Sequence, residues 1–457
     1  MKGETAANEN YQESLSYLFG LQRFGIKLGL TNISALLKHL GNPHAGLRAV
    51  HIAGSNGKGS TAAFLASVLH QAGYRVGLYT SPHLVDFGER IQINGVPISA
   101  EEVIQLTRQI REVAEKMKED GELWPEAKRE NLPRNFDPKE STITFFEFIT
   151  AMAFLHFLEK EVEIAVLETG MGGRLDATNV INPVLSLITS ISLEHQQYLG
   201  NTLLEIAGEK AGIIKARRPL LTSARQPEVL ALLQRRCGEL HSPFYAWQKD
   251  FGAKKLAPQL IDFQGRSHRW SELCLGLAGD HQMINASLAL AGVEVLMESG
   301  FPIEETHLRR GLAGVKWSGR LELIGEHPRV LLDGAHNPEG TQVLRKALEE
   351  GFPRRRLILV LGIMGDKEIP RMMADLVPIA DLLVLTRAQL DRAASLETLR
   401  AQASSFRKPT LETARVDEAL ARALTEAGDQ DLILVAGSLY VVGEARAYLA
   451  NHGLVSS

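Results

Sequence analysis

The chain has 457 residues, of which 45% are hydrophobic and 23% charged, and its formal net charge is −4. These values are typical of a globular protein with two or three cores, and they exclude a global basic field for nucleic acid or an anionic membrane. The first residues are polar and lack the apolar segment of a secretory signal, and no apolar run reaches the roughly 18–20 residues that span a bilayer. Two cysteines, Cys237 and Cys274, are too few for a disulfide framework, so we expect buried free thiols in a cytoplasmic protein.

In the first part of the chain, short apolar strands alternate with amphipathic helices. Strands are predicted at 47–53, 75–80, 163–167 and 183–192, and helices at 60–72 and 143–160, the first of which should stop at Gly73. This alternation predicts an α/β fold with a mainly parallel sheet.

Two segments interrupt the pattern. Residues 117–140 are charged and contain three prolines, which predicts a long loop that is either a lid or a simple insertion. Residues 225–275 show no clear period, and we expect irregular structure there with small antiparallel strands.

A second α/β unit follows the glycine-rich stretch 311–319, which predicts a hinge. Strands are predicted at 329–333, 356–361, 381–386 and 431–436, and helices at 338–350, at 416–427 and after Gly437. This smaller, Rossmann-like unit has no phosphate loop of its own. We therefore predict an N-terminal domain at 1–312, a hinge at 313–321 and a C-terminal α/β domain at 322–457.

The sequence GSNGKGS at residues 54–60 lies between a predicted strand and a predicted helix. Glycines allow backbone N–H groups to surround an anion, and the helix N-terminus adds its positive dipole. Lys58 can reach the β- and γ-phosphates of ATP, and the Ser60 hydroxyl can bind Mg²⁺. The spacing departs from the common G-x-x-x-x-G-K-[ST] pattern, because Gly59 separates Lys58 from Ser60. A glycine-rich turn that merely starts a helix is the alternative, and the flanking strand and helix count against it.

This variant loop and a series of further motifs resemble the Mur ligase superfamily and, within it, the folylpolyglutamate synthase / dihydrofolate synthase family. In chain order the motifs are TSPHL (80–84), FGERI (87–91), TFFEF (144–148), LETGMGGRLDATN (167–179), His195 with YLG (198–200), EKAGI (209–213), HQMINA (281–286), WSGR (317–320) and LDGAHNP (332–338). The chain has Glu194 before His195 where the family usually has aspartate.

The resemblance implies an ATP-dependent ligase of the bifunctional dihydrofolate synthase / folylpolyglutamate synthase kind. ATP would phosphorylate a carboxylate of 7,8-dihydropteroate or of a reduced folate, and the amine of L-glutamate would attack the acyl phosphate. The two domains then correspond to an ATP-binding domain of the Mur ligase central type and a glutamate ligase domain. We expect a monomer whose partners are these small molecules, with no nucleic acid and no membrane.

The family's catalytic and metal positions fall on residues with several possible roles. Glu168 ends a buried strand, where a carboxylate suits Mg²⁺, although a turn or capping role is also open. The resemblance implies a second metal held by Ser81, Glu168 and His195, and it implies that Lys210 carries a CO₂-derived carbamate near that metal. Taken alone, Ser81 is typical of a turn, His195 of a strand end and Lys210 of an exposed helix. The implied catalytic residues are Lys58, Lys210 and His195.

The family's substrate and nucleotide positions complete the predicted site. The pterin pocket is implied beside Phe146, Glu147, Leu175, Asp176 and Ala177, although aromatic residues at this spacing are usually core. Further nucleotide contacts are implied at Asn285, Arg320, Asp333 and His336, besides Gly57, Lys58, Gly59 and Ser60 of the loop. Arg320 follows the hinge, so its guanidinium could reach the phosphates when the domains close.

Other functions remain to be weighed. A Mur-type amide ligase with a non-folate substrate usually has GK[ST] without the extra glycine and a separate domain before the loop, for which too few residues precede Gly54. A regulatory P-loop ATPase would not need the second unit, and it would hydrolyse ATP without glutamate. An inactive binding protein is disfavoured because lysine, metal-type and hinge residues are all retained.

Overall fold

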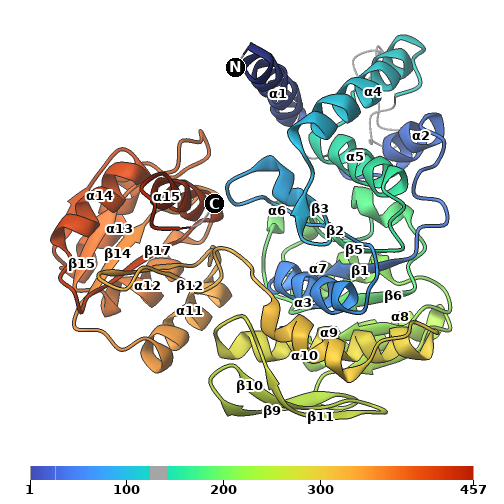
Figure 1. The fold of residues 1–457 in the computed structure, drawn as a ribbon. Coiled ribbons are helices and arrows are strands. Elements are labelled where there is room, and N and C mark those ends of the chain that lie inside the picture. The colour runs from blue at the N-terminus through green and yellow to red at the C-terminus, as the bar shows by residue number, and fades with distance from the viewer. Residues whose placement is uncertain (1, 26, 124–141, 456–457) are drawn as a thin grey trace.

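The computed structural model describes residues 2–25, 27–123 and 142–455. The chain forms two α/β bodies side by side, and a small antiparallel sheet lies beneath the first (Figure 1). The prediction of an α/β fold with a mainly parallel first sheet is confirmed. Most of the predicted loop at 117–140 lies outside the described residues, and its first residues instead end helix α4 (Ala100–Glu119).

The first body is built on an eight-stranded sheet with the order β4-β3-β2-β5-β1-β6-β7-β8. Its strands are β1 (Ala49–Ala53), β2 (Val76–Tyr79), β3 (Ile91–Ile93), β4 (Val96–Pro97), β5 (Ile164–Glu168), β6 (Leu185–Ile188), β7 (Leu220–Thr222) and β8 (Phe244–Ala246). All run parallel except β3 and β4, which add antiparallel pairs at one edge. The central strands β1 and β5 are buried along their length, as expected for parallel strands covered on both faces.

Helices cover both faces of this sheet. The helices are α1 (Lys2–Gly20), α2 (Thr31–His39), α3 (Lys58–Gln71), α4, α5 (Phe145–Glu159), α6 (Gln196–Leu199), α7 (Leu203–Lys210), α8 (Pro227–Glu239), α9 (Asp280–Glu298) and α10 (Glu305–Gly314). Val50 and Ile52 of β1 pack with α3, α9 and α10, whereas Ala49 packs with α1, α2, α4 and α5. The alternation of side chains along a strand thus divides the core into two layers.

The segment 225–275 is more regular than predicted. It contains helix α8, β8 and then an antiparallel sheet of β9 (Gly252–Ala257), β10 (Leu260–Gln264) and β11 (Arg269–Cys274). The antiparallel strands were expected, but helix α8 was not. Within α8 only Val229, Leu233 and Cys237 are buried, so its apolar stripe is too narrow to stand out in the sequence.

The second body has a six-stranded sheet with the order β12-β13-β17-β14-β15-β16, parallel apart from β12. The strands are β12 (Glu322–Ile324), β13 (Arg329–Leu332), β14 (Leu357–Leu361), β15 (Leu382–Leu385), β16 (Thr410–Glu412) and β17 (Leu432–Ala436). The helices are α11 (Pro338–Gly351), α12 (Ile369–Leu376), α13 (Leu396–Ala403), α14 (Val416–Glu426) and α15 (Leu439–Asn451). Apolar clusters on both faces of the sheet make it a second core.

The connection between the bodies begins later than the glycine pattern predicted. Helix α10 continues to Gly314, so Gly311 and Gly314 are helical residues and not part of a linker. A Cβ on Gly311 would lie 2.6 Å from the Cα of Val68, so this glycine allows α10 to approach α3 closely. Residues 315–321 make the connection itself.

Two further expectations concern the burial of the cysteines and the hydropathy of the helices. Cys237 is buried, but Cys274 is exposed, contrary to the expectation of two buried thiols. In the described part of the chain, every helix is too short or too polar to span a bilayer.

Candidate active site

The phosphate loop connects β1 to α3 and needs its glycines. Gly54 and Gly57 have φ of +148° and +88°, and a Cβ on them would lie 1.8 Å from Thr189 Oγ1 and 2.3 Å from Asn285 Oδ1. Helix α3 begins at Lys58, so the last glycines of the loop are at the helix N-terminus, where free N–H groups favour an anion. The Lys58 ammonium folds back over the loop and donates to the carbonyls of Gly54 (2.9 Å) and Ser55 (3.3 Å).

A cavity of 1230 Å³ opens in front of this loop. Its first wall is formed by segments that follow β1, β2, β5 and β6, the carboxyl ends at which ligands collect in parallel sheets. Its second wall comes from the other body, including His336, Lys367 and Tyr440. The predicted residues in the lining are Gly57, Lys58, Gly59, Ser60, Ser81, Phe146, Glu147, Glu168, Leu175, Asp176, Ala177, His195, Asn285, Arg320 and His336. Lys210 and Asp333 are outside the lining, but Lys210 donates to Glu194 and Asp333 accepts from the N–H of Ala335, and both partners belong to it.

Glu168 ends β5 in the middle of the cavity, 5% exposed. Burial raises its pKa, and this effect is opposed by Lys58, by the backbone N–H of Ser81 at 3.2 Å and by Arg320. A divalent cation bound beside Glu168 would likewise offset the free-energy cost of burying its negative charge. The Ser60 hydroxyl lies at the start of α3 and accepts from Gln282 Nε2 at 3.3 Å.

The donors near Glu168 fit Mg²⁺ better than a softer metal. The described residues contain no group of three or more His, Cys, Asp or Glu side chains arranged to hold a metal without help. The cavity lining instead includes the buried Glu168 carboxylate and the hydroxyls of Ser60 and Ser81. Mg²⁺ accepts such a partial set of oxygen ligands, because it completes its shell with phosphate oxygens and water.

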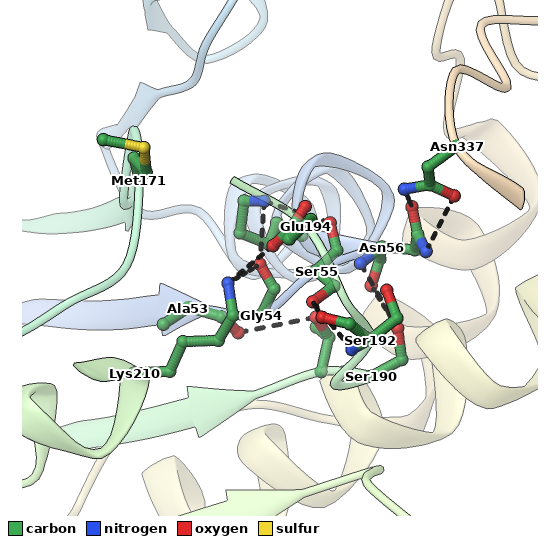
Figure 2. Close-up of polar contacts among 12 residues, drawn as sticks. Ala53, Gly54, Ser55, Asn56, Met171, Ser190, Ser192, Glu194, Lys210 and Asn337 are labelled. Carbon is green, nitrogen blue, oxygen red and sulfur yellow. Dashed lines mark hydrogen bonds and ion pairs between the residues drawn. The ribbon is translucent and has the colours of Figure 1, made fainter. Parts of the chain in front are cut away.

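Lys210, Glu194 and the loop form a buried ionic cluster (Figure 2). The Lys210 ammonium, 1% exposed, donates to Glu194 Oε1 at 2.7 Å and to the Gly54 carbonyl at 2.8 Å. Burial lowers the pKa of Lys210 despite the opposing effect of Glu194. Burial also disfavours the Glu194 anion, but Lys210, Lys58 and His195 lower its pKa to about 2.

His195 follows Glu194 in the chain, and its backbone lies in the left-handed region with φ of +46°. Burial lowers the pKa of its ring to about 4, although Glu194 opposes the change. The imidazole is therefore neutral near pH 7, the state in which a ring nitrogen can bind a metal.

The predicted pterin residues surround one end of the cavity. Phe146 packs beside Tyr79, and it fits because a Cβ on Gly170 would lie 2.5 Å from the ring. Glu147 accepts from the backbone N–H and the hydroxyl of Thr144, so it caps α5 as well as facing the cavity.

Asp176 is held by three protein donors. It accepts from the N–H of Met171 at 2.9 Å, and from the N–H and hydroxyl of Thr178 at 3.0 and 2.6 Å. Burial raises its pKa. Behind it, His51 of β1 contacts the Thr178 hydroxyl at 2.8 Å, so a buried polar chain runs from the central strand to the cavity.

The predicted nucleotide contacts have different surroundings. Asn285 of α9 lies against Gly57 and donates to Gln282. Arg320 lines the cavity, and its guanidinium donates to the Gly319 carbonyl. Asp333 accepts from the backbone N–H groups of Leu321 and Ala335, which anchors the connection to β13. His336 contacts the Gly334 carbonyl, and burial lowers its pKa to about 4.

Several cavity residues were missing from the predicted site. His83, Arg90 and Lys367 line it, and Arg90 donates to His83 Nδ1 at 2.7 Å. Asn56 of the phosphate loop contacts the second body. His83, Arg90 and Asn56 lie inside the recognised motifs, which was the available signal, whereas Lys367 lies in none of them.

The chain is similar to known proteins over nearly its whole length. Residues 52–293 match the Mur ligase middle domain, and residues 319–439 match the Mur ligase glutamate ligase domain. The chain is 36% identical to a dihydrofolate synthase/folylpolyglutamate synthase of Bacillus subtilis, over 96% of this chain and 99% of that protein. A solved folylpolyglutamate synthase of Thermotoga maritima is similar with a TM-score of 0.82 and 35% identity, covering 98% of both chains. One from Mycobacterium tuberculosis, complexed with ADP, has a TM-score of 0.85 and 32% identity, covering 96% of this chain and 98% of that one.

Proposed function

The chain belongs to the Mur ligase family, and we propose that it is an ATP-dependent ligase that joins L-glutamate to 7,8-dihydropteroate and to reduced folates. The resemblance drawn from the motifs is confirmed, because relatives with these activities are similar over nearly the whole chain. The observation that carries the proposal is the cavity. It places a phosphate loop, a pocket with an aromatic wall and residues of the glutamate ligase domain around one space.

The proposed reaction has two steps that this cavity can support. A carboxylate oxygen of the pteroate attacks the γ-phosphorus of ATP, which gives an acyl phosphate and ADP. The glutamate amine then attacks the acyl carbon, loses a proton and expels phosphate. Lys58 and the N–H groups at the start of α3 would balance the phosphoryl charge. The second body would exclude water from the acyl phosphate, which hydrolyses if it is exposed.

We propose Mg²⁺ at two places. Ser60 would hold one ion with the phosphates, and Ser81, Glu168 and His195 would hold the other, with a carbamate on Lys210. Bound Mg²⁺ would neutralise negative charge on the phosphoryl oxygens. The buried amine of Lys210 suits carbamylation, which requires the neutral form, but the ion pair with Glu194 would have to break.

The remaining site residues are proposed in the roles that the family implies. Phe146, Glu147, Leu175, Asp176 and Ala177 would bind the pterin, and Asn285, Arg320, Asp333 and His336 would serve the nucleotide. We propose domains at 1–314 and 322–457 joined by residues 315–321. The connection starts two residues later than the predicted hinge at 313–321, because helix α10 continues to Gly314. We propose a monomer, because one chain contributes both walls of the cavity.

A direct assay tests the function. The purified protein is incubated with ATP, Mg²⁺ and labelled glutamate, with dihydropteroate and tetrahydrofolate in parallel reactions. We expect label in both products and little phosphate release when either co-substrate is left out. Incorporation into neither product would reject the folate assignment, and rapid ATP hydrolysis without glutamate would favour a regulatory ATPase.

Lys58→Ala provides the matched negative control. Removal of this ammonium should lower kcat by roughly 10²–10³-fold, the usual effect of deleting one preorganised charge partner of a transition state. Folding is checked by thermal unfolding, which should change little because the hydrogen bonds of the Lys58 ammonium within the described residues are to loop carbonyls. Activity close to wild type in this variant would contradict the role of the loop.

A further inference from the structure

The phosphate loop makes a direct hydrogen-bonded contact with the second body. Asn56, in the middle of the loop, exchanges side-chain hydrogen bonds with Asn337, which precedes helix α11 (Figure 2). Asn337 Nδ2 donates to Asn56 Oδ1 at 2.9 Å, and Asn56 Nδ2 donates to Asn337 Oδ1 at 3.5 Å. Asn56 Nδ2 also donates to Glu339 Oε2 at 2.5 Å. We refer to Asn56, Asn337 and Glu339 as the clasp.

Each end of the clasp is fixed to its own body. On the loop side, the Asn56 N–H donates to Ser190 Oγ at 3.2 Å, and this serine follows β6. On the other side, Asn337 Oδ1 accepts from the N–H of Gly340 at 2.8 Å and so caps α11. Asn337 is 6% exposed. A movement of one body therefore pulls on a residue that is rigidly held by the other.

The position of the clasp relates it to the chemistry. Asn56 directly precedes Gly57 and Lys58, which line the cavity, while α11 starts in the domain that matches the glutamate ligase family. Any change in the separation of the bodies must either break these amide contacts or move the loop. Asn56 and Asn337 thus connect the shape of the nucleotide loop to the closure of the cavity.

We propose that Asn56 and Asn337 are positioning residues that hold the second body closed over the phosphate loop. The acyl phosphate then reacts with the amino acid before water can hydrolyse it. This inference rests on the proposed ligase function for its kinetic consequences, but the closure that it describes can be measured without turnover.

Asn337→Ser isolates the clasp from the helix cap. Serine is a good N-cap residue and keeps a hydroxyl for Gly340, but it is too short to reach Asn56. Asn337→Ala is the control that loses both functions, and Asn56→Ser cuts the clasp from the loop side. We expect Asn337→Ser to retain the melting temperature better than Asn337→Ala.

The first measurement is the ratio of ADP to amide product. The wild-type protein should form equal amounts, because each acyl phosphate is captured by glutamate. Asn337→Ser and Asn56→Ser should form excess ADP, and the KM for glutamate should rise on the order of tenfold, as expected when hydrogen bonds that favour the closed state are lost. ADP should still bind, because the glycine and lysine contacts of the phosphate loop remain.

The double variant distinguishes a shared contact from two separate defects. If the two amides act through each other, Asn56→Ser combined with Asn337→Ser should be no worse than Asn56→Ser alone, which already removes the contacts with both Asn337 and Glu339. Additive losses, or single variants with equal ADP and amide and a wild-type KM, would overturn the proposal.

Small-angle X-ray scattering supplies the second, activity-independent measurement. The Asn337→Ser protein should have a larger radius of gyration than the wild type, with and without a non-hydrolysable ATP analogue. If the wild type forms no amide from either acceptor, the ligase assignment fails, and scattering alone decides the clasp: a more open variant supports it, and identical curves overturn it.

Discussion

Lys210 combines burial, which favours a neutral amine, with an ion pair, which favours an ammonium. Its ammonium is 2.7 Å from Glu194, yet burial lowers its pKa overall. Carbamylation consumes the neutral amine, so it competes with this ion pair. The Glu194 carboxylate reaches the amine directly.

We predict that Lys210 binds CO₂ and that Glu194→Gln increases the bound fraction, because the ion pair no longer stabilises the ammonium. Intact-mass analysis should show one CO₂ near neutral pH, lost on acidification as the amine becomes protonated. Enriched bicarbonate should give a carbamate carbon signal by NMR in the wild type and none in Lys210→Arg. Acetate or formate should partly restore Lys210→Ala, and full activity of that variant without rescue would refute the role.

Thr178 gives a second prediction at this scale. Its hydroxyl donates to Asp176 and accepts from His51, so Thr178→Val leaves the buried His51 Nε2 without a partner and removes a donor from the carboxylate. We expect a loss of about 1–3 kcal/mol in the free energy of unfolding. We also expect a higher KM for the pteroate acceptor, because the pKa of Asp176, already raised by burial, rises further.

Thr386→Val is the matched control for this change. The Thr386 hydroxyl is buried, and it has no hydrogen-bond partner among the described residues. Urea unfolding should therefore show little change or a small gain in stability. Equal losses of unfolding free energy in Thr178→Val and Thr386→Val would mean that the hydrogen bonds of Thr178 with His51 and Asp176 do not stabilise the fold.

Most of the site residues predicted from the sequence line the cavity, but the sequence does not show what holds them in place. The motif at 54–60 was enough to expect Lys58 and Ser60 beside a helix N-terminus. The capping bonds of Glu147 follow the local T-x-x-E spacing from Thr144 and could have been predicted. The backbone contact of Asp333 with Leu321 could not, because it depends on how the connection folds onto β13. Contacts between residues far apart in the chain, such as Lys210 with Gly54, require the tertiary arrangement.

At the scale of elements, the packing of α10 on α3 depends on one glycine. A Cβ on Gly311 would lie 2.6 Å from the Cα and 2.8 Å from the N of Val68, which are backbone atoms of α3 and cannot turn aside. We predict that Gly311→Ala separates the helices and destabilises the protein by about 1–3 kcal/mol.

Gly314→Ala in the same helix is the control, because nothing lies within 4 Å of its added Cβ. Its effect should be small or slightly stabilising, since alanine has the higher helix propensity. Chemical denaturation of both variants measures the difference. A Gly311→Ala protein as stable as Gly314→Ala would show that this helix contact is not tight in solution.

Gly311 and Gly314 show why helices and strands could be predicted from the sequence, although the residues at which they end could not. Buried strands such as β14 and β17 are continuous apolar runs and were identified within a residue or so. The glycine-rich stretch suggested a flexible hinge, whereas Gly311 serves a close helix contact. Glycine permits both uses, and only the neighbouring atoms distinguish them.

At the scale of the whole molecule, the site exists only between the two bodies. Two α/β units and a connection could be predicted from periodicity, because each unit satisfies its own core. The relative orientation of the two units could not be predicted. The contacts between them involve few residues, and these residues do not form a periodic hydrophobic pattern in the sequence. The Asn56–Asn337 pair and the contact between Leu84 and Gly443 are examples.

Gly443 tests whether this relative orientation is the one used in catalysis. The residue lies in α15 of the second body, and a Cβ on it would lie 1.9 Å from the carbonyl oxygen of Leu84 in the first body. Gly443→Ala must therefore push the bodies apart or move the segment that carries Ser81. Because misplacement of reacting groups by about 1 Å can cost on the order of a hundredfold in rate, we expect kcat/KM to fall by at least about tenfold.

The matched control is Gly351→Ala, which adds the same methyl group to α11 where nothing lies within 4 Å. Gly443→Ala alone should alter the scattering curve. If Gly443→Ala retains wild-type kcat/KM, Leu84 and Gly443 do not touch during the reaction. The catalytic arrangement of the bodies would then differ from the closed one that brings Lys58, Glu168 and His336 around a single cavity.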